Sequence, residues 1–274
     1  MMPLPPPAPP FCDDPRFGGI ARLYGRAGLQ KLSQAHVCVV GVGGVGSWAV
    51  EALARSGVGS LTLIDLDEVC VTNINRQLPA MSDTVGRPKV EVLAQRVRLI
   101  NPECAVRAEQ EFLTRATAER LLGESFDWVI DAIDVPVNKC LLLAACRERE
   151  LPVLTIGGAG GKRDATAVRV SDLGQSGQDP LLKVVRRDLR RVHGLEFAPG
   201  KMMGIPCVFS AEPPVYPWSN GEVCEAREDG GALLMDCASG FGAATFVTGA
   251  FGFVAAGEVV RRIALGATET AQKA

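Results

Sequence analysis

A six-residue Gly-rich segment, set between an apolar run and a helical pattern, constrains the fold more than any other feature. Residues 36–40 read HVCVV, which is typical of a buried strand, and GVGGVG (41–46) follows at once. Apolar residues in 44–57 then recur at helical spacing. In this strand–turn–helix context, G-x-G-x-x-G predicts a loop whose backbone N–H groups hold phosphate at a helix N-terminus. The glycines concerned are Gly41, Gly43, Gly44 and Gly46. A tight turn without a ligand is the alternative.

Strands and helices alternate through the first 160 residues. Short β-rich runs occupy 60–67, 105–112, 126–134 and 152–157, with helical patterns over 85–100 and 138–149. This alternation predicts an α/β fold, a Rossmann-like doubly wound and mainly parallel sheet with helices on both faces.

The C-terminal half is less regular. A strand is expected at 166–173, loops with short strands over 194–235, and a Gly-rich helix over about 238–265. We therefore expect a flexible Pro-rich leader at 1–15, a single domain at 16–265 in which 160–235 is a substrate-facing insert, and a tail at 266–274.

Composition excludes some classes of protein. The 274 residues include 29 basic and 31 acidic side chains, which argues against a globally basic nucleic-acid binder. The nine cysteines include no C-x-x-C pair, which argues against a disulfide framework and an all-cysteine zinc site. We expect a reducing, cytoplasmic location.

One run raises a membrane question. No charged residue lies between Asp236 and Glu258, which is long enough to span a bilayer. Because the run is rich in Gly, Ala, Ser and Thr, we interpret it as a buried helix packed on the sheet. Membrane association of this C-terminal segment is the alternative.

Polar residues gather where the predicted strands end. Asp65 and Asp67 close the second strand, about 20 residues beyond the glycines, where an acid accepts hydrogen bonds from ribose hydroxyls. Cations and amides follow, at Asn73, Asn75, Arg76, Gln77 and Lys89. A dehydrogenase has no need of an Arg and a Lys here, whereas stabilising a transferring phosphate does need cations.

A second acidic pair, Asp131 and Asp134, follows the fourth strand. A carboxylate at the crevice edge of the sheet can hold Mg²⁺, which prefers one or two carboxylates together with phosphate oxygens and waters. We expect Asp134 to be that ligand. A surface polar group is the alternative for each residue taken alone.

With these motifs in place, the chain resembles the adenylating superfamily of ubiquitin-activating enzymes and bacterial activators of sulfur-carrier proteins. It is most similar to the branch that dehydrates threonylcarbamoyladenosine in tRNA. Segments that carry the resemblance are RFGGIARLYG (16–25), VCVTNINRQ (69–77), TIGGAGGKRD (155–164), QDPL (178–181), VFSAEPPVYP (208–217) and MDCASGFGAAT (235–245).

The resemblance implies an activity. ATP would adenylate the threonine carboxylate of threonylcarbamoyladenosine beside the tRNA anticodon, and ring closure within the same side chain would release AMP, with net loss of water. The implied cofactors are ATP and Mg²⁺, with a monovalent cation as a further candidate. The implied partners are tRNA and a second copy of the chain.

Site residues follow from the same resemblance. The four glycines would cradle phosphates, Asp65 and Asp67 would bind the nucleotide, Asn75, Arg76 and Lys89 would engage phosphates, and Asp134 would hold Mg²⁺. Zinc is not carried over, because the C-x-x-C pairs of the sulfur-carrier activators are absent. Where those relatives offer an arginine from the partner subunit, this chain has Gly19, with Arg22 nearby as a candidate.

Cys237 could be a thioester-forming nucleophile or a small residue packed near a helix start. Ring closure within the substrate needs no covalent cysteine.

A basic stripe is expected on a helix after residue 180. Lys183, Arg186, Arg187, Arg190 and Arg191 would share one face, with Leu182, Val185, Leu189 and Val192 opposite. Such a stripe suits the tRNA backbone, and Lys162 and Arg163 could extend it. An ordinary solvated helix is the alternative.

Three other functions stay open at this point. An NAD-dependent oxidoreductase would leave Arg76, Lys89 and Asp134 without a use. An activator of a sulfur-carrier protein would be driven by a protein C-terminus and would use Cys237. A sulfur-relay partner of a cysteine desulfurase would need no ATP.

Overall fold

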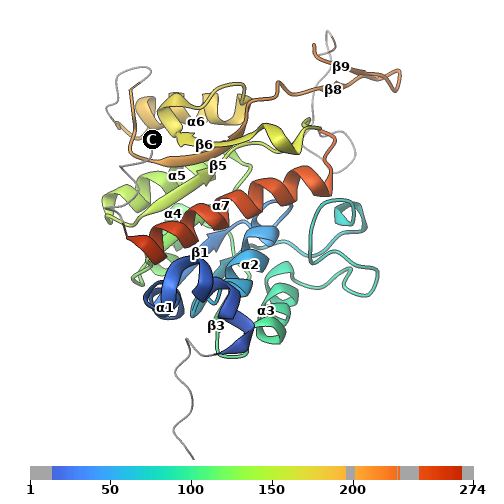
Figure 1. Ribbon diagram of the computed structural model, residues 1–274. Helices are drawn as coiled ribbons and strands as arrows, with labels where there is room; N and C mark the ends of the chain where they lie inside the picture. The colour runs from blue at the N-terminus through green and yellow to red at the C-terminus, as the bar shows by residue number, and fades with distance from the viewer. Residues whose placement is uncertain (1–13, 196–200, 227, 229–240, 267–274) are drawn as a thin grey trace, which may run out of the picture.

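The computed structural model describes residues 14–195, 201–226, 228 and 241–266. A seven-stranded sheet in the order β3-β2-β1-β4-β5-β7-β6 forms the centre of this part (Figure 1). Five strands match expected ones: β1 (His36–Val40), β2 (Ser60–Ile64), β3 (Ala105–Glu109), β4 (Trp128–Asp131) and β5 (Val153–Ile156). They pair in parallel, so the carboxyl ends of β1, β2 and β4 meet at one edge. The predicted Rossmann-like class is confirmed.

Helices cover both faces of the sheet. Alternate residues of β1 show this, because Val37 and Val39 pack with α2 (Gly46–Arg55), α3 (Lys89–Ile100) and α7 (Thr245–Leu265), whereas Cys38 and Val40 belong to the opposite cluster. That second cluster includes residues of α4 (Arg115–Leu121), α5 (Pro136–Glu148) and α6 (Pro180–Arg191).

The Gly-rich C-terminal helix is buried, as expected. Helix α7 lies across one face of the sheet against α2 and α1 (Gly18–Gln34), as Figure 1 shows. Its glycines allow this close approach, since a Cβ on Gly252 would lie 2.5 Å from the Val45 carbonyl oxygen. Among the described helices, none combines the length and apolar character needed to cross a membrane.

The less regular half also contributes to the sheet. Strand β7 (Pro206–Ser210) pairs in parallel with β5 and antiparallel with β6 (Val168–Asp172). The strand expected at 166–173 is present as β6, and β7 is one of the short strands expected within 194–235, with residues 207–210 buried. Two further short strands, β8 (Tyr216–Pro217) and β9 (Val223–Cys224), form a separate ribbon.

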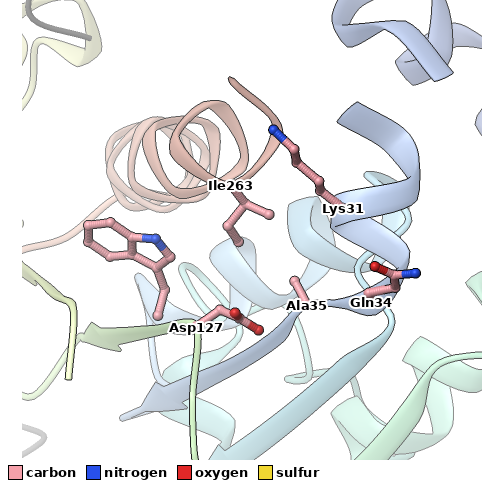
Figure 2. Close-up of a pocket in the computed structure, with 6 residues that line it drawn as sticks. Lys31, Gln34, Ala35, Asp127 and Ile263 are labelled. Carbon is pink, nitrogen blue, oxygen red and sulfur yellow. The ribbon is translucent and has the colours of Figure 1, made fainter. Parts of the chain in front are cut away.

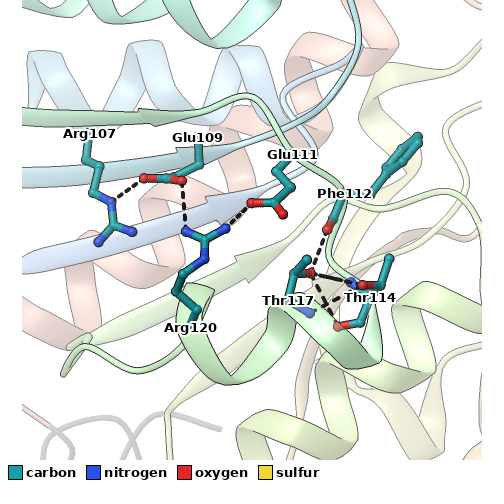
Figure 3. Close-up of polar contacts among 7 residues, drawn as sticks. All are labelled: Arg107, Glu109, Glu111, Phe112, Thr114, Thr117 and Arg120. Carbon is teal, nitrogen blue, oxygen red and sulfur yellow. Dashed lines mark hydrogen bonds and ion pairs between the residues drawn. The ribbon is translucent and has the colours of Figure 1, made fainter.

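Charged side chains protect the β3 edge of the sheet. Arg107 and Glu109 of β3 pair at 2.5 Å, and Arg120 of α4 reaches both Glu109 and Glu111 (Figure 3). Helix α4, which we did not predict, begins at a capping box in which Thr114 and Thr117 bond reciprocally (Figure 3). Charges on an edge strand discourage pairing with another chain.

Candidate nucleotide site at the carboxyl edge of the sheet

Two glycines of the Gly-rich loop are required by the chain itself. Gly41 has φ +83°, and a Cβ there would lie 2.8 Å from the Ala132 carbonyl oxygen. A Cβ on Gly46 would overlap the carbonyl oxygen of Gly41. Both glycines therefore serve the tight turn that joins β1 to α2 and brings it against the end of β4.

The other two glycines are not required by close contacts within the chain. A Cβ on Gly43 would come no nearer than 3.6 Å to any atom, and one on Gly44 no nearer than 3.5 Å. No hydrogen bond within the described residues uses the backbone N–H of Gly43, Gly44 or Gly46. Unused donors at the start of a helix form a favourable environment for an anion.

Asp65 lies directly beside this loop. Its Oδ2 accepts from the Val42 N–H at 2.8 Å and its Oδ1 from the Asp67 N–H at 2.9 Å. Burial raises the pKa of the Asp65 carboxyl, and the nearby Lys89 ammonium opposes that rise. The carboxylate is thus fixed at the end of β2, where a ribose would be expected.

Lys89 and Asp67 form an ion pair. The Lys89 Nζ lies 2.7 Å from Asp67 Oδ2, and its backbone N–H donates to the Asp67 carbonyl at 3.0 Å. Lys89 is only 4% exposed at the first turn of α3. The structure therefore places this predicted cation close to the acids of β2.

Arg76 is half-buried, and its side chain bends back along its own loop. Its Nη1 donates to the Thr72 carbonyl at 2.7 Å and to Asn75 Oδ1 at 3.0 Å. Its Cγ is 3.6 Å from the position of a Cβ on Gly44, which brings Arg76 beside the Gly-rich loop.

The Asn75 side chain is already engaged within the chain. Its Nδ2 donates to the Ala243 carbonyl at 2.8 Å, while its Oδ1 accepts from Arg76. The amide therefore joins two segments, and contact of Asn75 with phosphate stays a prediction, since Nδ2 carries a second hydrogen.

The two acids after β4 differ sharply. Asp134 is exposed, and no hydrogen bond or ion pair in the described part of the chain uses its carboxylate. Asp131 is fully buried, pairs with the Lys139 ammonium at 2.9 Å, and accepts from Thr155 Oγ1 at 2.7 Å. Only Asp134 is free to meet a ligand.

Lys139 is a residue that we missed. Its Nζ also donates to the Ile133 carbonyl at 2.9 Å, which ties the loop before Asp134 to α5. The signal was present, because Lys139 falls three and four positions before Leu142 and Leu143 on the buried side of α5. A lysine on an apolar helical face is buried only when it is paired.

Arg22 stands apart from this site. Its side chain is exposed on the first half of α1. The second half of α1 lies at the amino ends of β1 and β2, where the Gly59 N–H donates to the Leu32 carbonyl. The nucleotide residues lie at the opposite edge. Contact of Arg22 with a nucleotide stays a prediction, and it would have to be made to a second subunit.

The basic helix forms as expected but with fewer free cations. Helix α6 begins at Pro180, capped by Asp179, and buries Leu182, Val185 and Leu189. Val192, expected on the same side, is 67% exposed because the helix ends at Arg191. Arg186 is half-buried and donates to Ser176 Oγ and to the Leu173 carbonyl. Lys183, Arg187, Arg190 and Arg191 are exposed, although Arg187 pairs with Asp188 at 2.7 Å.

Lys162 does not extend that stripe. It is 3% exposed, and its Nζ donates to the carbonyls of Gln178 and Glu212, an arrangement in which burial lowers the lysine pKa. Arg163 is exposed beside it. The expected contribution of Lys162 to a tRNA surface is therefore corrected: this ammonium joins two loops.

Cys237 lies outside the described residues. Cys70, which we did not single out, is half-exposed at the start of the loop that carries Arg76, and hydrogen bonds from Thr72 lower its pKa.

A hollow of about 320 Å³ lies at the other edge of the sheet (Figure 2). Its lining includes Ala35, just before β1, and Asp127, just before β4, so it faces away from the Gly-rich loop. The remaining lining residues are Lys31, Gln34, Trp128 and Ile263. Asp127 is already bonded, accepting from the His36 N–H at 2.7 Å.

Together, the fold and the loop with unused N–H groups define a nucleotide-binding α/β protein. A family model described as the ThiF family matches residues 19–273. The tRNA threonylcarbamoyladenosine dehydratase of Escherichia coli is 50% identical over 249 residues, which cover 90% of this chain and 93% of that enzyme.

Solved structures agree. A crystal structure of the E. coli tRNA N6-threonylcarbamoyladenosine dehydratase in complex with ATP has a TM-score of 0.82 and 45% identity, covering 93% of this chain and 96% of that one. The same enzyme in complex with AMP has a TM-score of 0.82 and 46% identity, with the same coverage. The chain belongs to the ThiF family and, within it, to the tRNA threonylcarbamoyladenosine dehydratases.

Proposed function

We propose that this protein uses ATP to dehydrate threonylcarbamoyladenosine in tRNA. The observation that supports the proposal is a 50% identity to a dehydratase over 93% of that enzyme's length, together with a Gly-rich loop whose N–H groups are unused in the described residues. Relatives solved with ATP and with AMP are the nucleotide complexes expected of an adenylating enzyme.

The first chemical step is adenylation. A carboxylate oxygen of the threonyl group attacks the α-phosphorus of ATP, and the bond to the bridging oxygen of pyrophosphate breaks. Arg76 lies beside the loop and Lys89 pairs with Asp67 after β2, and cations in fixed positions stabilise the charge that builds up on the phosphates. The product is a mixed anhydride with AMP as a good leaving group.

The second step closes a ring. A nucleophile of the same modified side chain attacks the activated carbonyl, loses its proton, and expels AMP. The carboxylate oxygen leaves with AMP, so the nucleoside loses one water overall. Since nucleophile and electrophile share one molecule, much of the barrier is removed by proximity, and the chain needs to supply no covalent cysteine.

The exposed, unpaired carboxylate of Asp134 fits a magnesium ion, which takes few protein ligands and fills its other positions with phosphate oxygens and water. A bound Mg²⁺ would neutralise charge on the transferring phosphates. Asp134 would hold the ion, and the Lys139 bond to the Ile133 carbonyl would keep its loop in place.

The exposed cations of α6 form the proposed tRNA surface. The helix begins beside the nucleotide edge, because Asp179 accepts from the Gly158 N–H just after β5 at 2.9 Å. Lys183, Arg187, Arg190 and Arg191 would contact backbone phosphates, with Arg163 nearby.

A second copy of the chain is proposed to cover the face made by α1 and α7. Leu23 is 75% exposed, Phe246 62% and Phe253 49%, all on helices of this one face. Arg22 adjoins Leu23, so a partner on this face could receive its guanidinium. Sedimentation of wild type and Phe253→Glu tests this: a dimer that the substitution dissociates supports it, and a monomeric wild type contradicts it.

Mass spectrometry of nucleosides tests the function itself. Modified tRNA is incubated with the protein, with and without ATP, alongside an Arg76→Ala variant. We expect threonylcarbamoyladenosine to lose one water only with wild type and ATP. Pyrophosphate exchange driven by a carrier-protein C-terminus and not by tRNA would instead identify a sulfur-carrier activator. Binding to a cysteine desulfurase with sulfur loading and no ATP requirement would identify a sulfur-relay protein.

A further inference from the structure

The backbone of Arg76 is held by two helices that lie far from it in the sequence. Its carbonyl oxygen accepts from the Trp48 Nε1 of α2 and from the Thr248 Oγ1 of α7, each at 3.1 Å. Thr248 is 2% exposed, and Trp48 is half-buried. The main chain of Arg76 is therefore held by two donors, whereas its side chain donates to different residues, Thr72 and Asn75.

The residue before Arg76 is tied to the same helix. Asn75 donates through Nδ2 to the Ala243 carbonyl at 2.8 Å, and Thr245 Oγ1 donates to the Asn75 carbonyl. Three hydrogen bonds thus join Asn75 and Arg76 to residues 243–248, across about 170 positions of sequence.

Thr248 also lies beside the Gly-rich loop. Its Cγ2 is 3.5 Å from the position of a Cβ on Gly44, and the Arg76 Cγ is 3.6 Å from the same position. Its methyl group thus lies beside the loop while its hydroxyl donates to the Arg76 carbonyl, which places Thr248 between these two parts of the proposed nucleotide site.

The segment before Thr248 reaches the loop after β5. The Gly161 N–H donates to the Gly242 carbonyl at 2.8 Å, and the rings of Phe241 and Tyr216 lie 5.3 Å apart. Residues 241–248, which we name the bridging segment, therefore connect the 157–161 loop to Arg76.

We propose that Thr248, supported by Trp48 and Asn75, is a positioning residue that holds Arg76 where its guanidinium can reach the phosphates of a nucleotide. The inference rests on the proposed function, which assigns phosphate binding to Arg76. Side chains that bind phosphate work only when a supporting layer fixes them, because displacement of a charged group by about 1 Å is costly.

Thr248→Val removes the hydroxyl and keeps the shape. We expect its ATP dissociation constant to rise by about 2- to 10-fold, the range that one neutral hydrogen bond accounts for. Adenosine, which has no phosphate, should bind as it does to wild type. Thr248→Ser restores the hydroxyl and should restore ATP binding.

A double-variant comparison separates positioning from general disturbance. Arg76→Ala keeps the carbonyl and both its hydrogen bonds but lacks the guanidinium, so adding Thr248→Val to it should change ATP binding no further. Calorimetric titration with ATP and adenosine measures all four proteins. If Thr248→Val does not fold, Trp48→Phe removes the other donor and takes its place.

The inference is overturned if Thr248→Val binds ATP as wild type does, weakens adenosine equally, or acts as strongly in the Arg76→Ala background. A different result would contradict the proposed function: the single variant Arg76→Ala would keep full ATP binding and activity.

Discussion

Lys139 Nζ lies 2.9 Å from Asp131 Oδ2, and both side chains are completely buried. Burial raises the pKa of Asp131, while the Lys139 ammonium and the Thr155 hydroxyl act against that rise. The pair connects β4, β5 and α5 directly behind the loop that presents Asp134.

Removing one partner of this pair should destabilise the fold. Lys139→Met leaves the Asp131 carboxylate buried without its counter-charge, which costs about 3–5 kcal/mol. Urea denaturation measures the free energy of unfolding. The double variant Lys139→Met with Asp131→Asn removes both charges and should be less destabilised than Lys139→Met alone. A single variant within about 0.5 kcal/mol of wild type would contradict the pairing.

The two kinds of glycine in the loop should respond differently to alanine. Gly46→Ala would place a methyl group on the Gly41 carbonyl and should unfold or distort the β1–α2 turn. In Gly43→Ala the methyl group comes no nearer than 3.6 Å to its neighbour, Gln77 Nε2, so the variant should fold with nearly unchanged thermal stability. It should lose at least about 10-fold in ATP affinity, because the methyl group occupies the phosphate position. If Gly43→Ala bound ATP as tightly as wild type, the prediction that this loop binds phosphate would be wrong.

ATP binding should depend on pH through Asp65. Burial raises the pKa of the Asp65 carboxyl. It therefore takes up its proton at a higher pH than an exposed Asp, whose pKa is about 3.9. The protonated form is a poorer acceptor for a ribose hydroxyl. We therefore expect the ATP dissociation constant to rise on acidification before an exposed Asp would titrate. Asp65→Asn should bind ATP weakly at every pH. Because it lacks the titrating carboxyl, it is the control for pH effects that come from the phosphates of ATP.

Charge reversal on α6 should weaken tRNA binding. Arg190→Glu and Arg191→Glu change exposed cations, and each lost phosphate contact should reduce the slope of log affinity against log salt by about 0.9. Filter binding across a salt series measures this. Arg98→Glu, an equal charge change on α3 at the opposite face, is the control. Equal effects of the α6 and α3 variants would exclude a specific surface on α6. Arg186 is unsuitable for this test, because it is bonded to Ser176.

Among the seven cysteines in the described ranges, Cys70 should be alkylated first. Five of them are buried, and burial raises their thiol pKa values, to about 11 for Cys104 and about 12 for Cys146 for example. Cys70 is half-exposed with a lowered pKa. Peptide mapping after brief iodoacetamide treatment should find its peptide labelled ahead of the other six, and Thr72→Val, which removes the hydroxyl bonded to the sulfur, should slow the labelling. Equal labelling of Cys70 and Cys104 would contradict this.

Local patterns in the sequence determined much of this protein. Strand and helix periodicity predicted the sheet class, and spacing from the Gly-rich loop predicted that Asp65 would lie beside it. The amphipathic pattern of α6 also predicted which side would be buried. These features depend on residues a few positions apart, whose arrangement is set by helix and strand geometry.

Only the tertiary structure decided which polar groups are free. Asp134 is exposed while Asp131, three positions earlier, is buried with Lys139, and Lys162 is occupied by two carbonyls although Arg163 is exposed. Asn75 bonds to Ala243, 168 positions away, and Arg76 to Thr248, 172 positions away. No periodicity encodes such partners, because packing of separate elements, and not local geometry, brings them within hydrogen-bonding distance.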